Sequence, residues 1–172
     1  RNGDAIDGAT ADSYVLAQAD VGKPMSVRVS YTDGMGTAEA VTSDATASVT
    51  NVNDLPSGAV SVVGAATQGH TLTANTTTLA DLDGLGTLAY QWLRNGNAID
   101  GATAATYSLV QADVGSAISV RVSYTDLMGT AESVTSAATA NVVVPANITL
   151  TGTAGAETLN GDMGNDSLSG LG

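Results

Sequence analysis

Short runs of alternating apolar and polar residues recur along this chain. In the clearest run, residues 117–126, every second residue from position 118 to position 124 is apolar. Side chains of a β-strand point alternately to its two faces, so one face of this strand is predicted to line a core. The residues predicted to face inward are Ile118, Val120, Val122 and Tyr124. The residues predicted to face outward are Ser119, Arg121 and Ser123.

Further short strands are predicted on both sides of this run, and no segment has the apolar period of a helix. They span residues 58–63, 69–75, 87–93, 98–99, 106–110 and 130–143. The sequence Arg94-Asn-Gly-Asn between two of them is typical of a tight hairpin. Trp92 is predicted to lie in the core, because large aromatic side chains dominate the apolar area that a small domain buries. About seven short strands at regular spacing predict an all-β sandwich.

Most of this pattern occurs twice in the chain. Three segments return nearly unchanged 93 positions later: Arg1–Thr10 as Arg94–Thr103, Gln18–Gly22 as Gln111–Gly115, and Ser26–Asp33 as Ser119–Asp126. The offset holds over about fifty residues with roughly three quarters of the pairs identical, which indicates a repeated module. We interpret residues 1–50 as the C-terminal part of one module and residues 57–144 as a complete one. The chain opens in mid-module, so we interpret it as a fragment.

Residues 51–56 are predicted to form a linker, since Pro56 and Gly58 mark a boundary between the modules. The oxygens of Asn53 and Asp54 suit an inter-module cation, and the run faintly resembles the linker of cadherin-like modules. A turn in which these side chains bond their own backbone is the favoured interpretation, because the other cadherin calcium motifs are not evident.

The acidity of the chain limits the kinds of partner that it is expected to bind. The formal net charge is −12, from 5 Lys and Arg against 17 Asp and Glu. Phosphate binding depends on Lys and Arg, so no nucleic-acid partner is expected. Acidic side chains keep a protein soluble, and they also suit hard cations such as Ca²⁺. The absence of Cys excludes disulfides and thiolate chemistry, and no apolar run approaches the roughly 18–20 residues of a membrane span.

Neither catalysis nor metal binding is predicted within the modules. The single histidine, His70, has no His or Cys partner in the sequence, so a triad is not expected around it. The segment Asp81-Leu-Asp-Gly has acids before a glycine, as calcium loops do, but it lacks their third acid and distal Glu, so a plain loop is favoured. Asp33 and Asp126 follow the Tyr of their strands and are predicted to cap hairpin turns.

Two stretches of the complete module resemble an immunoglobulin-like domain. Tyr90–Ile99 is similar to its third strand and following hairpin, with Trp92 as the core tryptophan, and Asp113-Val-Gly resembles the corner before its sixth strand. The two disulfide cysteines of that family are absent, and Ala117 or Ile118 falls where its corner Tyr would stand. The resemblance is to Cys-free bacterial repeat modules of large secreted proteins, and it implies a spacer or adhesive role.

The C-terminal residues 152–172 follow a period of nine. Glycine recurs at the first and fourth places, an acid at the sixth and leucine at the eighth, which matches the calcium-binding nonapeptide G-G-x-G-x-D-x-U-x. Glycine allows tight turns that direct backbone carbonyls toward a hard cation, and the acid adds a carboxylate. The leucines at the eighth place, Leu159 and Leu168, are predicted to lie on short strands and face the interior, with Leu150 beginning the same ladder.

The tail resembles the RTX, or hemolysin-type, calcium-binding repeat of secreted bacterial proteins. This resemblance implies a parallel β-roll in which each Ca²⁺ lies between one turn and the turn two repeats later. By position it assigns these residues to calcium: Gly155, Glu157, Gly161, Asp162, Gly164, Asn165 and Asp166. The first repeat is degraded, because Thr153 replaces a Gly and its acid is a Glu, and the third stops before its acid. Since a Ca²⁺ site needs about six to eight oxygens, we expect ligands but no full site; the alternative is a flexible Gly-rich tail.

Together these features predict a non-enzymatic, calcium-binding piece of a large secreted or cell-surface bacterial protein. Immunoglobulin-like β-sandwich modules would serve as a spacer or adhesive stalk, and residues 145–172 would begin the parallel β-roll. The expected partners are calcium ions and cell-surface or matrix ligands. The alternative is the non-catalytic calcium-binding region of a secreted hydrolase or toxin. Direct glycan binding is a weaker interpretation, because the single Trp is predicted to be buried.

Overall fold

The computed structural model describes residues 1–146, 149–151 and 167–169. The chain divides into unit 1, Arg1–Asp54, and unit 2, Leu55–Gly172, and the division falls within the segment predicted as a linker. Helical structure in the described residues is limited to two three-residue 3₁₀ turns, η1 (Gln18–Asp20) and η2 (Gln111–Asp113). The rest is strands, turns and irregular backbone, so the prediction of an all-β chain is confirmed.

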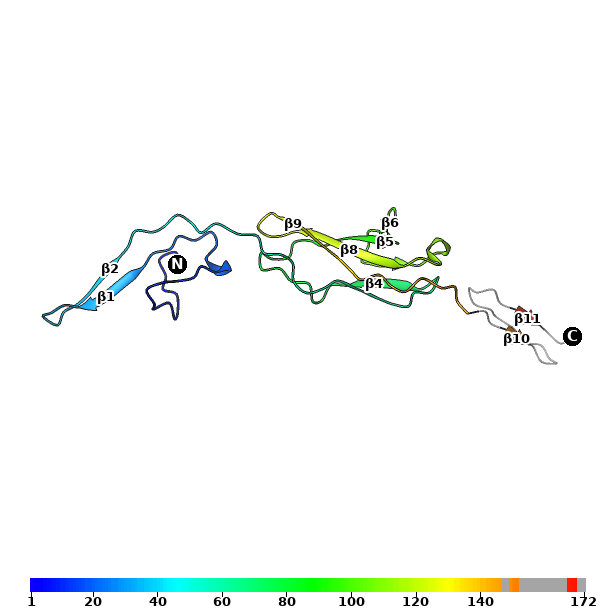
Figure 1. Ribbon diagram of the computed structural model, residues 1–172, viewed down its shortest axis with the longest axis horizontal. Helices are drawn as coiled ribbons and strands as arrows, with labels where there is room; N and C mark the ends of the chain where they lie inside the picture. Colours follow the sequence, from blue (N-terminus) through cyan, green and yellow to red (C-terminus); the bar gives the residue numbers. More distant parts are fainter. Residues whose placement is uncertain (147–148, 152–166, 170–172) are drawn as a thin grey trace. The chain divides into compact units, whose positions relative to one another are not determined.

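Unit 2 contains two antiparallel sheets, which Figure 1 shows as two layers. The first has the order β3 (Ser61–Val63), β4 (Thr71–Asn75), β7 (Thr106–Ser108). The second has the order β6 (Asn97–Ala98), β5 (Ala89–Arg94), β8 (Ile118–Thr125), β9 (Ala131–Thr135). Between β5 and β6, Asn95 and Gly96 have φ angles of 48° and 82°, the conformation of a two-residue hairpin turn. The predicted hairpin is therefore confirmed.

The core of unit 2 is one cluster to which both sheets contribute. Trp92 of β5 is fully buried. Its indole N–H donates a 2.9 Å hydrogen bond to the Ala104 carbonyl, and its ring stacks on Tyr107 with the ring centroids 5.8 Å apart. Leu72 of β4 belongs to the same cluster. The four residues of β8 that were predicted to face inward are buried there as well: Ile118, Val120, Val122 and Tyr124.

The main differences from the prediction are the exposure of Ser119 and the bounds of several strands, such as β3 and β7, which are shorter than predicted. Ser119, predicted to face outward, is buried, because it pairs directly with the larger Leu93 of β5 and directly paired residues share a face. The last predicted strand is shorter than expected. After β9, the hydroxyls of Ser136 and Thr139 accept hydrogen bonds from backbone N–H groups of β8, and both bonds are 3.0 Å long. Side chains thus take part in the pairing where a regular strand would use its backbone alone.

Unit 1 repeats the second half of this module. Its strands β1 (Arg28–Thr32) and β2 (Ala38–Thr42) form a two-stranded antiparallel sheet, in the register that β8 and β9 have in unit 2. Among the described residues of unit 1, no strand pairs with the other edge of β1. Its apolar side chains are exposed, whereas their counterparts in β8 are buried.

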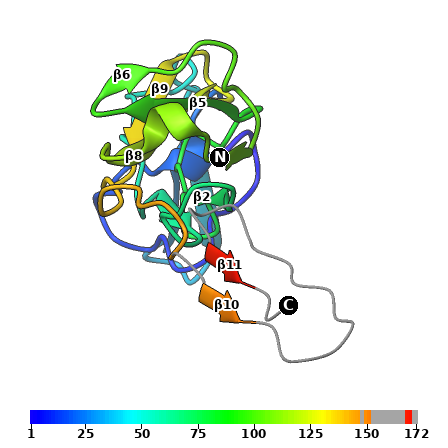
Figure 2. The ribbon, with the colours of Figure 1, turned by 90° about the vertical axis from the view of Figure 1, so that its right-hand side faces the viewer.

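A short parallel pair of strands lies near the C-terminus. β10 (Thr149–Thr151) pairs with β11 (Ser167–Ser169), as Figure 2 shows, with Leu150 opposite Leu168. Each residue of β10 is therefore paired with the residue 18 positions later. Because 18 residues are two of the nine-residue periods of the sequence, both strands occupy the seventh to ninth places of the period.

Candidate functional site

The seven residues predicted to bind calcium all lie outside the described residues: Gly155, Glu157, Gly161, Asp162, Gly164, Asn165 and Asp166. What the structure describes in this region is the pair of strands β10 and β11, which flank residues 152–166 in the sequence. Two members of the predicted leucine ladder, Leu150 and Leu168, are paired, and Leu159 lies outside the described residues.

A buried carboxylate closes the corner before β8. Asp113 is fully buried at the end of η2, where the 3₁₀ turn places its carboxylate within 2.7 Å of the Val110 N–H. The carboxylate also accepts a hydrogen bond from the Tyr107 hydroxyl at 3.0 Å and pairs with the Arg94 guanidinium at 2.6–2.7 Å. Charge-assisted bonds of this kind are strong, so the network joins the ends of β5 and β7 to the start of β8. Its chemistry is structural.

Unit 1 contains the same network. The carboxylate of Asp20 accepts the Ala17 N–H at 2.8 Å and the Tyr14 hydroxyl at 3.2 Å, and it pairs with Arg1 at 2.5 Å. These bonds, that of Ala17 foremost, lower the pKa of Asp20 against the opposing effect of burial. The sequence prediction recognised only the corner at the aspartate. The signal for the rest was present, because Arg, Tyr and Asp recur at the same spacing in both copies.

A second group of carboxylates lies at two neighbouring loops of unit 2. Asp81 accepts the N–H of Asp83 at 2.9 Å and the hydroxyl of Tyr124 at 2.6 Å. Asp126 accepts the N–H groups of Met128 and Thr130 at 2.9 and 2.8 Å, which confirms the predicted turn cap. Its second oxygen is buried without a hydrogen-bond partner. Burial, followed by the bond to Asp81, raises the pKa of Tyr124.

The geometry of these loops is that of turns. The backbone N–H of Leu127 lies within hydrogen-bond distance of the carbonyls of both Asp83 and Gly84, so the two loops bond through their main chains. Over residues 1–146, 149–151 and 167–169, no group of three or more His, Asp or Glu side chains is arranged to hold a metal ion. His70 is exposed and lies just before β4. Its backbone N–H donates to the Thr67 carbonyl, and its carbonyl accepts the N–H of Leu109.

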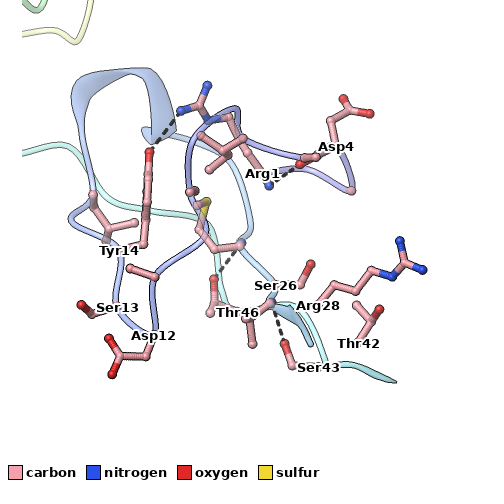
Figure 3. Close-up of a pocket in the computed structure, with 18 residues that line it drawn as sticks. Arg1, Asp4, Asp12, Ser13, Tyr14, Ser26, Arg28, Thr42, Ser43 and Thr46 are labelled. Atoms are coloured by element: carbon pink, nitrogen blue, oxygen red, sulfur yellow. Dashed lines mark hydrogen bonds between the residues drawn. The ribbon is translucent and has the colours of Figure 1, made fainter. Parts of the chain in front are cut away.

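The described part of unit 1 also contains a cavity of about 730 Å³, shown in Figure 3. Its lining includes Arg1 and Tyr14, which belong to the network around Asp20, and Met25 and Val27, which precede β1. The hydroxyls of Ser43 and Thr46 accept hydrogen bonds from the backbone N–H groups of Val27 and Met25, at 3.1 and 3.0 Å. The lining includes neither His nor Cys, and its side chains form no nucleophile and base pair.

No family model, curated protein or solved structure matches this chain. Its described residues include no helix that is long and apolar enough to cross a membrane.

Proposed function

We propose that this chain is a non-catalytic, calcium-binding region of a large secreted or cell-surface bacterial protein. In this proposal, immunoglobulin-like modules form a spacer, and the C-terminal nonapeptides bind Ca²⁺ in a parallel β-roll. The observation that carries the proposal is the parallel pairing of β10 with β11 at an offset of 18 residues.

The offset supports a roll because of the way nonapeptides stack. If each repeat supplies one turn and one short strand, consecutive strands lie on opposite sides of the roll, and a strand meets its parallel neighbour two repeats later. β10 and β11 have that separation and occupy the same places of the period. A flexible Gly-rich tail would not select this register, because register is weakly specified in glycine-rich strands.

The proposed ligands follow from the preference of Ca²⁺ for oxygen. Glycine turns direct carbonyls toward the ion, and carboxylate and amide side chains complete its coordination shell. The ligands proposed on these grounds are the turn residues Gly155, Glu157, Gly161, Asp162, Gly164, Asn165 and Asp166. Leucines at the eighth place would fill the interior of the roll, and the pairing of Leu150 with Leu168 agrees with that role.

The order of the strands in unit 2 supports an immunoglobulin-like module. If the strands are lettered in chain order, β3-β4-β7 corresponds to A-B-E and β6-β5-β8-β9 to C′-C-F-G, the two sheets of such a sandwich. Trp92 lies on the third strand and is buried between the sheets, as the core tryptophan of that fold is. One complete module preceded by part of another, without a catalytic constellation in the described residues, suits a spacer.

The calcium proposal is tested by extending the repeats. Two further copies of residues 161–169 are inserted after Ser169, and Ca²⁺ is titrated with calorimetry and far-ultraviolet circular dichroism. We expect saturable binding with a dissociation constant of roughly 10⁻⁴–10⁻³ M, the range of extracellular calcium modules, and a gain of β-structure. The unextended chain should bind at least ten-fold more weakly.

The matched control is the same insertion with Glu157→Ala, Asp162→Ala and Asp166→Ala, and with the equivalent changes in each added copy. It retains the glycines and leucines but removes the carboxylates, so we expect it neither to bind Ca²⁺ nor to gain β-structure. Calcium binding by this control, or the absence of any calcium response in the extended chain, would refute the proposal.

A further inference from the structure

Asn75, the last residue of β4, begins a short motif that the calcium proposal does not use. The sequence Asn75-Thr-Thr matches Asn-x-Ser/Thr, the acceptor pattern for attachment of a sugar to an asparagine amide. The same pattern begins at Asn147 and Asn165, which lie outside the described residues. An acceptor has to lie at the surface, in a loop or turn that a transferase reaches, and Asn75 meets this requirement.

The motif lies where β4 ends and a surface turn begins. Along β4, Leu72 is fully buried and Ala74 packs against the core cluster of unit 2. Because side chains alternate between the two faces of a strand, Asn75 is on the outer face with the exposed Thr73. Asn75 is half-buried, and Thr77, the third residue of the motif, is exposed in the turn. A sugar on Asn75 would therefore extend away from the core.

The amide of Asn75 is held by its oxygen and not by its nitrogen. The hydroxyl of Thr77 donates to the Asn75 Oδ1 over 2.8 Å, and the backbone N–H of Thr77 donates to the same oxygen over 3.0 Å. The Asn75 Nδ2 takes part in none of the hydrogen bonds among the described residues. Asn95 differs, because its Oδ1 accepts the Ala117 N–H and its Nδ2 donates to Ser116. The nitrogen of Asn75 is thus available for chemistry.

The rest of unit 2 fixes the turn that carries Thr77. The hydroxyl of Thr78 donates to the Ala59 carbonyl over 3.1 Å and accepts the Ala59 N–H at 3.3 Å. The N–H of Leu79 donates to the Thr76 carbonyl over 3.1 Å, and the side chain of Leu79 is buried. The turn is therefore preorganised, and a transferase need not order it on binding.

The two hydrogen bonds from Thr77 favour reaction at the Asn75 nitrogen. An amide nitrogen is a weak nucleophile, because it shares its lone pair with the carbonyl group. When the nitrogen loses a proton, negative charge develops on the oxygen. Donors placed where charge develops lower the barrier of a reaction, and Thr77 places two donors on this oxygen.

We propose that Asn75 is a site of N-linked glycosylation, modified by a transferase that recognises Asn-x-Ser/Thr and uses a pyrophosphate-linked sugar. In this reaction the Asn75 Nδ2 forms a bond to C1 of the sugar. The bond between C1 and the pyrophosphate oxygen breaks, the pyrophosphate leaves with the electron pair, and one amide proton passes to a base of the transferase. The proposal does not depend on calcium binding.

The test uses the full folded chain, produced in cells without glycosylation enzymes, and two purified transferases of Asn-x-Ser/Thr specificity. One uses a nucleotide-linked sugar, and the other uses an oligosaccharide linked to a polyprenyl pyrophosphate. Peptide mass spectrometry measures the modified fraction of each asparagine. We expect Asn75 to be modified in at least one arm, and the successful arm identifies the class of donor. A synthetic peptide of residues 71–81 verifies that each transferase is active.

Variants of the chain test the role of the hydroxyl. Thr77→Val keeps the shape of the side chain and the backbone N–H but removes the hydroxyl, so we expect the rate at Asn75 to fall at least about ten-fold. Thr77→Ser retains the hydroxyl and should retain modification. Thr76→Val, at the middle position of the motif, is the matched control and should leave the rate unchanged. Circular dichroism verifies that each variant keeps its fold.

Three results would overturn the proposal. In the first, both transferases modify the peptide but neither modifies Asn75 of the folded chain, which would show that the fold closes the site. In the second, the sugar is found only at Asn147 or Asn165. In the third, Thr77→Val is modified at Asn75 as fast as the parent chain.

Discussion

Residues 1–50 and 94–143 are two copies of one sequence in two settings. In unit 2 the copy lies against residues 57–93, and in unit 1 it does not. The features that depend on short-range bonds are the same in both: the Asn-Gly turn, the η1 and η2 corners with their buried aspartates, and the aspartate caps of the β1–β2 and β8–β9 turns. Burial of the valines and tyrosine on the inner face differs.

The comparison separates two contributions to the fold. Turns, caps and the Arg–Asp–Tyr network join residues at most 19 positions apart, and they are present in both copies. The core requires strands that come from the other half of the module, and the hydrophobic effect acts only where those strands remove apolar surface from water. The local geometry thus prepares a face that the remaining strands then cover.

The largest expected effect comes from removing the residue at the centre of the covered core. Trp92→Ala should destabilise unit 2 by about 3–5 kcal/mol, because the cavity is only partly refilled. Unit 1 has no equivalent contact, so amide resonances of β1 and β2 should keep their positions. Urea titration followed residue by residue in NMR measures both units at once. Equal loss of signals from both units would contradict the comparison.

A matched pair of substitutions tests the covered and uncovered faces directly. Val122→Ala should destabilise unit 2 by about 2 kcal/mol through lost burial. Val29→Ala removes the same atoms from an exposed position and should change stability by less than about 0.5 kcal/mol. Urea midpoints of the two variants provide the measurement. Equal effects would mean that the inner face of unit 1 is covered in solution.

A smaller effect is expected from the tyrosine at the end of each inner face. Burial and the bond to Asp81 raise the pKa of Tyr124, whereas the pKa of Tyr31 is raised mainly by its bond to Glu39. A raised folded-state pKa contributes stability that is fully present below the unfolded value, about pH 10, and is lost as pH rises through the folded value. Tyr124→Phe should lower the free energy of unfolding of unit 2 by about 1 kcal/mol at neutral pH. It should also reduce the loss of stability at alkaline pH, because the tyrosine that causes this loss is absent.

The measurement is a urea titration at several pH values, with absorbance at 295 nm reporting tyrosine ionisation. Tyr31→Phe is the control, because its hydroxyl bonds an exposed partner in unit 1, and it should leave the pH dependence of unit 2 unchanged. An alkaline profile of Tyr124→Phe that matches the parent chain would contradict the assignment of this tyrosine.

Much of the fold was predictable because the repeat and the strand pattern are local signals. Alternation identified the buried face of β8, the Asn-Gly pair identified the β5–β6 turn, and the single Trp identified the core. The end of β9 was not predictable from propensity, since the hydroxyls of Ser136 and Thr139 replace strand bonds there. Ser119 was predicted to be exposed but is buried, because Leu93 of the neighbouring strand β5 is paired with it.

The candidate site also has a part that the sequence predicted and a part that it did not. The nonapeptide period could be read from the sequence, and the 18-residue register of β10 and β11 agrees with that period. The proposed ligands themselves lie outside the described residues, so their arrangement stays a prediction. The buried network around Asp113 joins residues up to 19 positions apart, and its signal, the recurrence of Arg, Tyr and Asp at the same spacing, is found only by comparing the two copies.

The register of the proposed β-roll is the most direct test of the account. The chain has no Cys, so Leu150→Cys with Leu168→Cys forms the only thiol pair, and oxidation is followed by mass spectrometry with and without Ca²⁺. Directly paired residues lie within reach of a disulfide, so we predict efficient cross-linking, which calcium accelerates in the chain extended by two copies of residues 161–169. The pair Leu150→Cys with Leu159→Cys, one repeat apart, should cross-link slowly. Faster cross-linking of that second pair, in calcium, would contradict the account.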